Sequence, residues 1–460
     1  MKRLCLILLA IALIGILIFG GCSKSTTTPT PTPTPAPTPA PAPQKVLKIG
    51  TTQDLSTLAG LETKNWYDLF AKLINDQGGW KIGSDTYKVE MVIYDDSSDA
   101  VKQKSNLEKL VLQDGCKYVL GGIFGVAGSA SVDITVTEPN KVIDISGDVS
   151  DASADPAVKY FYAAGGTYFG RGLMYRIYTD MLNEGVKSYV SVKTDNQMGH
   201  IGDAMCNQTW KLVGGDKIKF LGTIFYDPST TDYAPIATKI KNLNPDCIDG
   251  NYGIAAASFY SALKDVGYKG IILPSSIGSD DVANYVTKVG KDFIEGGECF
   301  FVDPRGLQKD PGMVALMDAY VKQYGDFKST AMLMLAPWFV LKDAIEHTQS
   351  VDVETVKKYL DNSNHAVMTL TTYVQLFARP DLNNYRTVCG TPPDLLGVIH
   401  DGKLTAVAGV GPETHYLSSV LSYGHVDIYK KYWDQYGYPK FPSDQQSVIH
   451  FSDLGITGHD

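Results

Sequence analysis

The chain has 460 residues, of which 44% are hydrophobic, and a formal net charge of −9. This length is enough for two or more lobes of ordinary domain size, each with its own core. The acidic balance argues against nucleic acid or anionic lipid as the partner of the folded part, because both carry negative charge.

The first 22 residues are typical of a bacterial lipoprotein signal. Two positive charges precede an apolar run over residues 4–19, which ends at Gly20-Gly21-Cys22. This is the layout of a secretory signal, and small residues just before a cysteine mark a lipoprotein cleavage site. An uncleaved membrane helix is the alternative, but the run is short for a bilayer span. We therefore expect a signal peptide over residues 1–21 and a lipid on Cys22.

Residues 23–44 are almost only Thr, Pro, Ala and Ser, with repeated Thr-Pro and Ala-Pro pairs. Such a segment cannot bury a core and is typical of an extended polyproline II spacer. We expect residues 22–44 to be a lipid-anchored linker. It would hold a soluble domain to a membrane outside the cytoplasm, in the periplasm or on the outer face of the cell.

From Val46 onward, short apolar strands alternate with helical patterns. In the first series, strands are expected at 46–50, 87–94, 118–120 and 142–145, with helices at 65–75, at 100–113 and from 129. A second series has strands at 188–192, 218–225, 247–250 and 271–274. Alternation of this kind predicts parallel sheets covered by helices on both faces. The two series predict an α/β chain with two lobes.

The cysteine and histidine patterns do not indicate catalysis. Besides Cys5 and Cys22, the chain has Cys116, Cys206, Cys247, Cys299 and Cys389. Their scattered spacing contains no Cys-x-x-Cys pair, and one or two disulfides or buried free thiols both remain open. The eight histidines lie far apart, and neither Gly-x-Ser-x-Gly nor His-Glu-x-x-His occurs. We expect no enzyme activity, no metal and no cofactor.

An ordered set of short motifs resembles one protein family. The motifs are Lys48-Ile49-Gly50, Ile74-Asn75-Asp76-Gln77-Gly78-Gly79, Tyr94-Asp95-Asp96, Lys117-Tyr118-Val119-Leu120-Gly121, Asn196-Gln197-Met198-Gly199 and Asp232-Tyr233. Together they resemble the substrate-binding proteins of branched-chain amino acid ABC transporters, the leucine/isoleucine/valine-binding group. The resemblance runs from about residue 45 to about residue 370.

The resemblance implies a type I periplasmic-binding fold, in which two doubly wound lobes with parallel central sheets are joined by three crossings. Lobe 1 would be residues 45–163 and 303–368, and lobe 2 residues 164–302 and 369–460, with the chain returning to lobe 2 near Leu370. Residues 163–165 and 301–304 fall where the family places its first two crossings. Beyond about Arg379 the chain is longer than the usual member, and we expect this extension to elaborate lobe 2.

In open α/β sheets, ligands bind beyond the carboxyl ends of the strands. Three loops of the first lobe fit this description, at 54–60, 124–129 and 146–150. Family members clamp an α-carboxylate with hydroxyls and backbone N–H groups of the later two. This chain departs there, because it has Gly125, Val126, Ala127 and Ser129 in one loop, and Gly147 and Asp148 in the other.

Two questions stay open in these loops. Asp148 would repel a carboxylate if it faced the cleft, or it caps the next helix and faces solvent. The glycines near Gly125 either contact ligand or let the loop pack tightly. Their spacing does not fit a dinucleotide fingerprint.

The second lobe also departs from the family pattern. Tyr252 matches a cleft tyrosine of the family, but Met198 stands where the family has a tyrosine lid. The acidic partner of the ligand ammonium is replaced by Ser275 or Ser276, unless Asp280 or Asp148 takes its place. A buried ammonium without a carboxylate would cost several kcal/mol, more than the roughly 1 kcal/mol that one hydroxyl returns.

These departures favour a small polar ligand, such as an amino acid, a related amide or an aromatic compound, that stacks on Tyr252 or Trp66. Trp66 is equally compatible with core packing. The resemblance implies a monomeric lipoprotein that delivers its ligand to an ABC permease in the membrane. The alternative is a sensory module that signals to a membrane receptor through the same fold.

Overall fold

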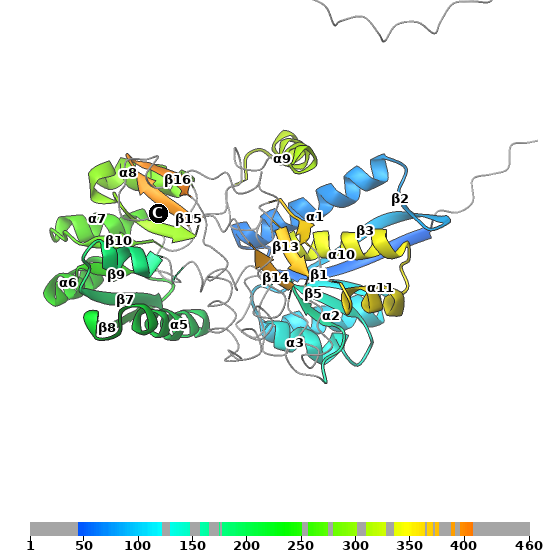
Figure 1. Cartoon of the computed structure of the whole chain (residues 1–460), viewed down its shortest axis with the longest axis horizontal. Helices are drawn as coiled ribbons and strands as arrows, with labels where there is room; N and C mark the ends of the chain where they lie inside the picture. The colour runs from blue at the N-terminus through cyan, green and yellow to red at the C-terminus, as the bar shows by residue number, and fades with distance from the viewer. Residues whose placement is uncertain are drawn as a thin grey trace, which may run out of the picture. The chain divides into compact units, whose positions relative to one another are not determined.

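The computed structural model describes residues 45–121, 129–147, 157–164, 174, 177–250, 256–274, 279–300, 310–327, 335–363, 366–370, 373–376, 388–391 and 396–407. The leader, the spacer and Cys22 therefore lie outside the described residues. The described elements form two lobes, each with its own parallel sheet and core (Figure 1). This confirms the predicted α/β class.

The first lobe is built on a six-stranded sheet in the order β2-β3-β1-β4-β5-β6. Its strands are β1 (Lys45–Gln53), β2 (Trp80–Ile82), β3 (Asp85–Asp95), β4 (Tyr118–Gly121), β5 (Ile143–Ser146) and β6 (Phe161–Ala163). All neighbouring pairs are parallel except β2 with β3. Every residue of β4 and β5 is buried, as expected for strands covered on both faces.

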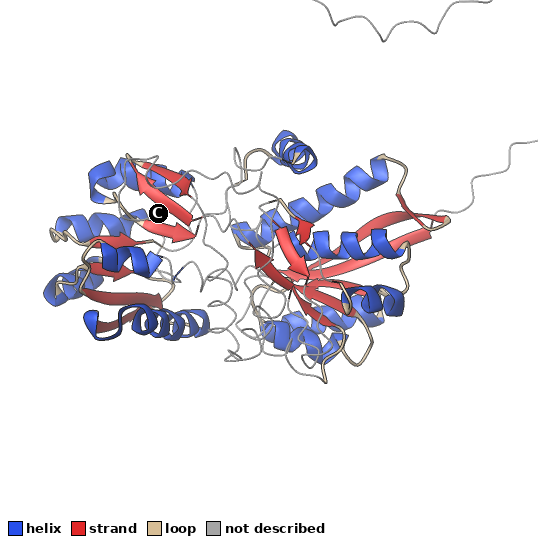
Figure 2. Cartoon of the chain, viewed as in Figure 1, coloured by secondary structure: helices blue, strands red, loops and turns tan. Residues whose placement is uncertain are grey.

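Helices cover this sheet on both faces (Figure 2). They are α1 (Leu58–Asp76), α2 (Ala100–Leu112), α3 (Ser129–Thr137), α9 (Pro311–Tyr324), α10 (Ala336–Thr348) and α11 (Val353–Leu360). Successive residues of β4 point to opposite faces: Tyr118 and Leu120 join the core under α1 and α10, while Val119 joins the core under α2 and α3.

One helix starts earlier than predicted. We expected the first helix to begin near Asn65, but α1 begins at Leu58, because the Thr57 hydroxyl accepts the Gly60 N–H and caps it. Leu58 and Leu61 are 54% and 46% exposed. Since this turn buries little apolar surface, the hydrophobic period did not reveal it.

The second lobe is built on a four-stranded parallel sheet in the order β10-β9-β7-β8. Its strands are β7 (Ser188–Thr194), β8 (Lys219–Tyr226), β9 (Cys247–Asp249) and β10 (Ile271–Leu273). Its helices are α5 (Gln197–Gly214), η2 (Gly215–Lys217), α6 (Ala234–Leu243), α7 (Ala257–Asp265), α8 (Ser279–Val289) and η3 (Lys291–Phe293). Val190 and Ile248 of the central strands are fully buried in its core.

The C-terminal part of the chain contributes to both lobes. β12 (Ala366–Met368), β13 (Tyr373–Leu376) and β14 (Val388–Thr391) form an antiparallel sheet, and β12 lies beside α10 of the first lobe. β15 (Leu396–His400) and β16 (Lys403–Val407) form a hairpin that pairs with β11 (Glu298–Phe300). Ile399 and Leu404 are buried in the second core.

The predicted domain division, with its return to lobe 2 near Leu370, stays a prediction, because residues 165 and 301–304 of the expected crossings lie outside the described part. Leu370 is fully buried in the first core together with Val367. Among the later residues with described side chains, Ile399 and Leu404 join the second core. Among the described helices, none is long and apolar enough to cross a membrane.

Candidate ligand-binding site

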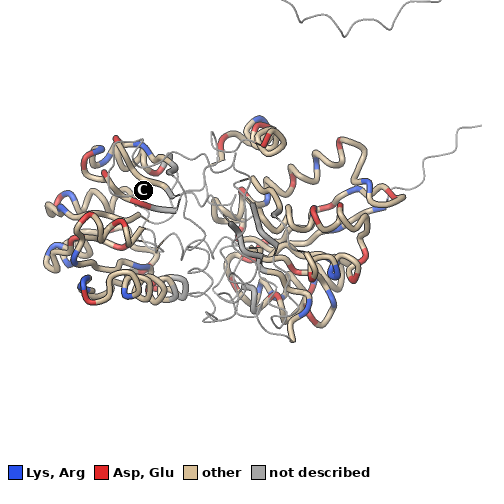
Figure 3. The backbone as a smooth tube through the Cα atoms, viewed as in Figure 1, with Lys and Arg blue, Asp and Glu red and all other residues tan. Residues whose placement is uncertain are grey.

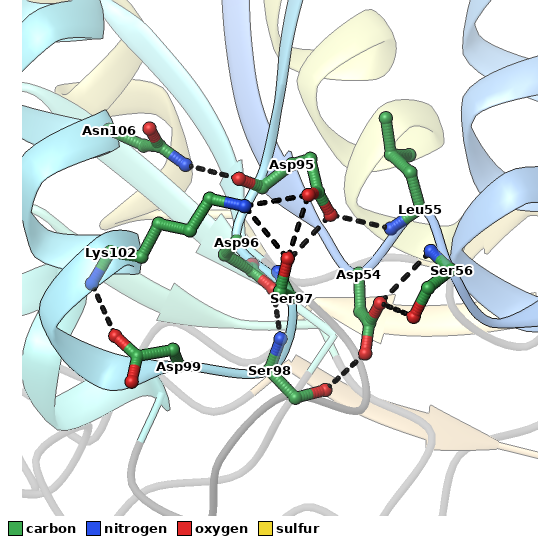
Figure 4. Close-up of polar contacts among 10 residues, drawn as sticks. All are labelled: Asp54, Leu55, Ser56, Asp95, Asp96, Ser97, Ser98, Asp99, Lys102 and Asn106. Atoms are coloured by element: carbon green, nitrogen blue, oxygen red, sulfur yellow. Dashed lines mark hydrogen bonds and ion pairs between the residues drawn. The ribbon is translucent and has the colours of Figure 1, made fainter.

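Asp95, the last residue of β3, ties two loops at the carboxyl edge of the first sheet (Figure 4). Its Oδ1 accepts the backbone N–H of Leu55, which follows β1, at 3.0 Å. Its Oδ2 accepts Lys102 Nζ at 2.6 Å and the Ser97 hydroxyl at 2.8 Å. The hydrogen bonds from Lys102 and Ser97 hold the pKa of Asp95 well below its usual range, so this carboxylate is ionised.

Asp54 makes a second connection in the same place. It accepts the Ser56 backbone N–H and hydroxyl on one oxygen and the Ser98 hydroxyl, at 2.6 Å, on the other. Burial opposes ionisation of Asp54, but the hydrogen bonds from Ser56 and Ser98 leave its pKa below the usual value. We call this arrangement, Asp54 to Ser56 with Asp95 to Lys102, the acidic turn.

The acidic turn is a scaffold rather than a set of open acceptors. Ser97 and Ser98 hold left-handed conformations, with φ of 51° and 54°, while their donors satisfy Asp95 and Asp54. No group of three or more His, Cys, Asp or Glu among the described residues could hold a metal ion. Acidic and basic residues are interspersed along the described backbone (Figure 3).

The next two strands lead into the loops that the sequence predicted to bind the ligand. Ser146 ends β5, and Gly147 after it is buried. Gly121 ends β4, and a Cβ there would lie 2.6 Å from the Ser146 hydroxyl, so the neighbouring strands meet closely. Ser129 begins α3, but its side chain is not described. Gly125, Val126, Ala127 and Asp148 lie outside the described residues, and their roles stay predictions.

Trp66 lies in the core of the first lobe. Its ring is fully buried and stacks on Tyr320 of α9 at a centroid distance of 4.1 Å. Phe70 and Phe327 pack against it at 5.8 Å each. Of the two alternatives for Trp66, the structure favours core packing over stacking on a ligand, because aromatic rings from two helices already surround the indole. Trp338 is likewise core, stacked on Phe70.

In the second lobe, the loop after β7 is fixed by a helix cap. Asn196 caps α5, and its side chain accepts the Gly199 N–H at 2.8 Å. A Cβ on Gly199 would lie 1.9 Å from the Thr194 carbonyl oxygen, so only glycine fits this turn. Met198 is in the first turn of α5, but its side chain is not described. His200 is exposed and bonds Asp195 at 2.8 Å.

The loop that contains Tyr252 starts from β9. Gly250 bonds the Leu273 carbonyl of β10 through its N–H at 2.9 Å, and a Cβ there would lie 2.5 Å from the same oxygen. Tyr252, Ser275 and Ser276 lie outside the described residues, and the side chain of Asp280 in α8 is not described. Their roles as ligand contacts stay predictions.

Sequence reasoning missed a buried ion pair beside these loops. Lys193 of β7 and Asp249 of β9 are both fully buried, with Lys193 Nζ 3.0 Å from Asp249 Oδ1. A lysine inside the apolar strand 188–194 was the available signal, because a lysine is almost never fully buried unless it is paired. Its partner is 56 residues away, and no local spacing identifies it.

The three cysteines whose side chains are described are structural. Cys116, Cys206 and Cys247 are free and buried. Burial raises the pKa of the Cys116 and Cys206 thiols to about 12 and raises that of Cys247 well above its usual value, so all three stay protonated at neutral pH. This supports the prediction of buried free thiols for these three positions.

A sequence profile of the periplasmic binding protein family matches residues 46–381. The chain belongs to this family. Membership implies a location outside the cytoplasm, and the family and its structural relatives are solute-binding proteins rather than enzymes. No curated protein matches the chain.

Solved structures with the same fold include proteins that bind different ligands. A leucine binding protein, LivK, from Thermotoga maritima is 16% identical, with 80% of this chain and 99% of that chain covered and a TM-score of 0.60. The branched-chain amino acid binding protein LivJ from Streptococcus pneumoniae, solved with isoleucine, is 17% identical, with 80% and 100% covered and a TM-score of 0.61.

A third similar structure is a solute binding protein of an ABC transporter from Rhodopseudomonas palustris, in complex with benzoate. It is 15% identical, with 79% of this chain and 96% of that chain covered and a TM-score of 0.59. At such identities the likeness establishes the fold alone. The predicted type I periplasmic-binding architecture is confirmed, whereas the leucine/isoleucine/valine specificity stays a prediction.

Proposed function

We propose that the protein is a lipid-anchored solute-binding protein that captures a small polar ligand and delivers it to an ABC importer. The observation that carries this proposal is the periplasmic binding protein match over residues 46–381, which covers the strands of both parallel sheets from Val46 onward. The lipoprotein signal over residues 1–22 and the Pro-rich linker support a tether to a membrane outside the cytoplasm.

The ligand is an uncharged or weakly charged polar compound, such as an amide or a small aromatic compound, or an amino acid held in an altered way. Two features support this class. Ser275 or Ser276 stands where the resemblance to the leucine-binding group places the acidic partner of the ligand ammonium. In addition, similar structures contain isoleucine in one case and benzoate in another, so the fold accommodates both ligand types.

Ligand binding works through a shift in population. The open and closed arrangements of the lobes are in equilibrium, and the ligand favours the closed one because it contacts both lobes there. The permease recognises the closed form. Tyr252, on the loop after β9, is the main ligand contact of the second lobe.

A thermal-shift screen of residues 44–460, which form one compact unit, tests the function. The panel contains amino acids, their amides and small aromatic acids. A ligand at a hundredfold excess over its dissociation constant stabilises the folded state by about 2.7 kcal/mol, which gives a clear shift. A panel in which no compound shifts the melting temperature would contradict the proposed ligand class.

Tyr252→Ala tests the site with the compound that gives the largest shift. We expect at least about tenfold weaker binding, equivalent to about 1.4 kcal/mol, with an unchanged melting temperature of the free protein. The matched control is Phe220→Ala, which removes a 45%-exposed aromatic ring near the amino end of β8, away from the carboxyl-end loops. Equal affinity in Tyr252→Ala and wild type would show that Tyr252 is not a ligand contact.

Lipid anchoring has a separate test. Labelled palmitate fed to expressing cells should enter the full-length wild-type chain but not Cys22→Ser, because the cysteine thiol carries the lipid. Equal labelling of the two chains would rule out Cys22 as the lipid site.

A further inference from the structure

The two central strands of the second lobe are joined at their carboxyl ends by a buried ion pair. Lys193 is next to last in β7, and Asp249 is the last residue of β9. Both side chains are fully buried. Lys193 Nζ lies 3.0 Å from Asp249 Oδ1 and also donates to the Asp249 carbonyl oxygen at 3.1 Å, so the pair involves both the side chain and the backbone of Asp249.

Two aromatic side chains also donate hydrogen bonds to Asp249. Its Oδ2 accepts the Tyr178 hydroxyl at 2.5 Å and the Trp210 Nε1–H at 2.8 Å. The two rings stack on each other with centroids 3.9 Å apart, and Trp210 belongs to α5. Asp249 is therefore connected to β7, to α5 and to the helical segment 177–183 at once. These contacts restrict the position of the end of β9.

Lys193 remains charged despite its burial. Burial is the largest effect and by itself would lower the pKa of Lys193, but the charge and hydrogen bond of Asp249, together with nearby Cys206 and Asp203, leave the pKa above its usual value. Replacing a buried ion pair by apolar residues of similar size is often neutral or stabilising, so such a pair is a poor device for stability alone. Its position is the better guide to its role.

The chain on either side of the pair leads into the two loops of the second lobe that are predicted to contact ligand. After Asp249 comes Gly250, which packs against the Leu273 carbonyl, and then the loop with Tyr252. After Lys193 come Thr194 and the Asn196 cap of α5, with Met198 in the first turn. One ion pair therefore fixes the starting points of both loops.

We propose that Lys193 and Asp249 are positioning residues, which fix the carboxyl ends of β7 and β9 and, with them, the turn at 194–199 and Gly250, where the two loops predicted to receive the ligand begin. Neither side chain touches the ligand, because both are fully buried. The pair acts by preventing the ends of β7 and β9 from shifting relative to each other. This role rests on the proposed function of the protein, but the order of the two loops can be measured without any ligand.

The test compares the double variant Lys193→Met/Asp249→Asn with wild type by hydrogen–deuterium exchange of the ligand-free chain. The double variant removes both charges without leaving one unpaired, and the amide oxygen of the new asparagine side chain keeps an acceptor for Tyr178 and Trp210. Without the pair, peptides over the turn at 194–199 and over Asp249 and Gly250 should exchange at least about tenfold faster. Peptides over the middle of β7 and over α6 should exchange as in wild type.

The matched control is Asp203→Asn, which alters a polar contact of the same lobe away from the strand ends. Asp203 of α5 accepts the Ser191 and Thr223 hydroxyls at 2.6 and 2.8 Å, in the middle of β7 and β8. It should leave exchange in the two loops unchanged. Unchanged loop exchange in the double variant, or faster exchange spread evenly over the lobe, would overturn the positioning role. A ligand screen without any hit, combined with faster loop exchange, would instead reject the proposed function and keep the positioning role.

Discussion

Asp144 of β5 tests whether the first lobe holds a buried carboxyl group in its protonated form. Its side chain is fully buried between the sheet and α3, and neither carboxylate oxygen has a hydrogen-bond partner among the described residues. Asp133 of α3 is the charge that acts on it, and Asp133 itself accepts the Gln103 side-chain amide at 2.7 Å. Burial first, and the charge of Asp133 second, raise the pKa of Asp144 well above its usual value.

The sign of the pH dependence follows from this shift. In the unfolded chain an aspartate loses its proton near pH 3.9, whereas folded Asp144 keeps it to much higher pH. The folded chain therefore binds one proton more in this window, and the free energy of unfolding falls by about 1.4 kcal/mol per pH unit. From pH 5 to pH 6.5, wild type should lose about 2 kcal/mol relative to Asp144→Asn, which has the same shape and no proton to release.

Urea unfolding of both chains at pH 5.0, 5.5, 6.0 and 6.5 measures this difference, because the midpoint and slope give the free energy of unfolding at each pH. Asp76→Asn is the control, since Asp76 lies on the surface and pairs with Lys72. Its effect should stay within about 0.5 kcal/mol at every pH. If the free energies of unfolding of wild type and Asp144→Asn changed equally with pH, Asp144 would ionise normally in the folded state. That result would refute the raised pKa of Asp144.

Substitutions at two further positions test packing. Trp66→Ala should lower the free energy of unfolding by about 3–5 kcal/mol, because the ring is fully buried against Tyr320, and Trp66→Phe should cost less; urea unfolding measures both. A small loss in Trp66→Ala, together with loss of ligand-induced stabilisation, would favour the ligand-stacking alternative. Gly250→Ala should also destabilise, since its Cβ would lie 2.5 Å from the Leu273 carbonyl oxygen. An unchanged urea midpoint in Gly250→Ala would mean that β9 and β10 can move apart to admit the Cβ without loss of stability.

The sequence predicted the parallel sheets well, because the alternation of apolar strands and amphipathic helices is repeated many times along the chain. The strand expected at 247–250 is β9, Cys247–Asp249, and the helix expected at 100–113 is α2, Ala100–Leu112. Apolar periodicity fixes such elements at many positions at once, so no single residue decides them. The exception is the start of α1, which depends on the Thr57 cap.

The candidate site was less predictable because a few loop residues decide it. Trp66 on an amphipathic helix is compatible with a core or a cleft, and only its stacking partner Tyr320, from residues 311–324, separates the two. The pair of Lys193 and Asp249 is a long-range contact with no motif. Tyr252 and the serines after β10 were found through the family resemblance, and no contact among the described residues tests them.

The two lobes differ in how they hold a buried charged group, and therefore in how their stability depends on pH. In the second lobe, Lys193 lies 3.0 Å from Asp249, and its raised pKa keeps the contribution of the lysine charge present at every pH below about 10. In the first lobe, Asp144 lacks a hydrogen-bond partner among the described residues and avoids charge by holding a proton. Of Lys193 and Asp144, only Asp144 should therefore make stability change between pH 5 and 6.5. In the double variant Lys193→Met/Asp249→Asn, the free energy of unfolding should fall with pH in this range as steeply as in wild type. In Asp144→Asn, the fall should be smaller by about 1.4 kcal/mol per pH unit.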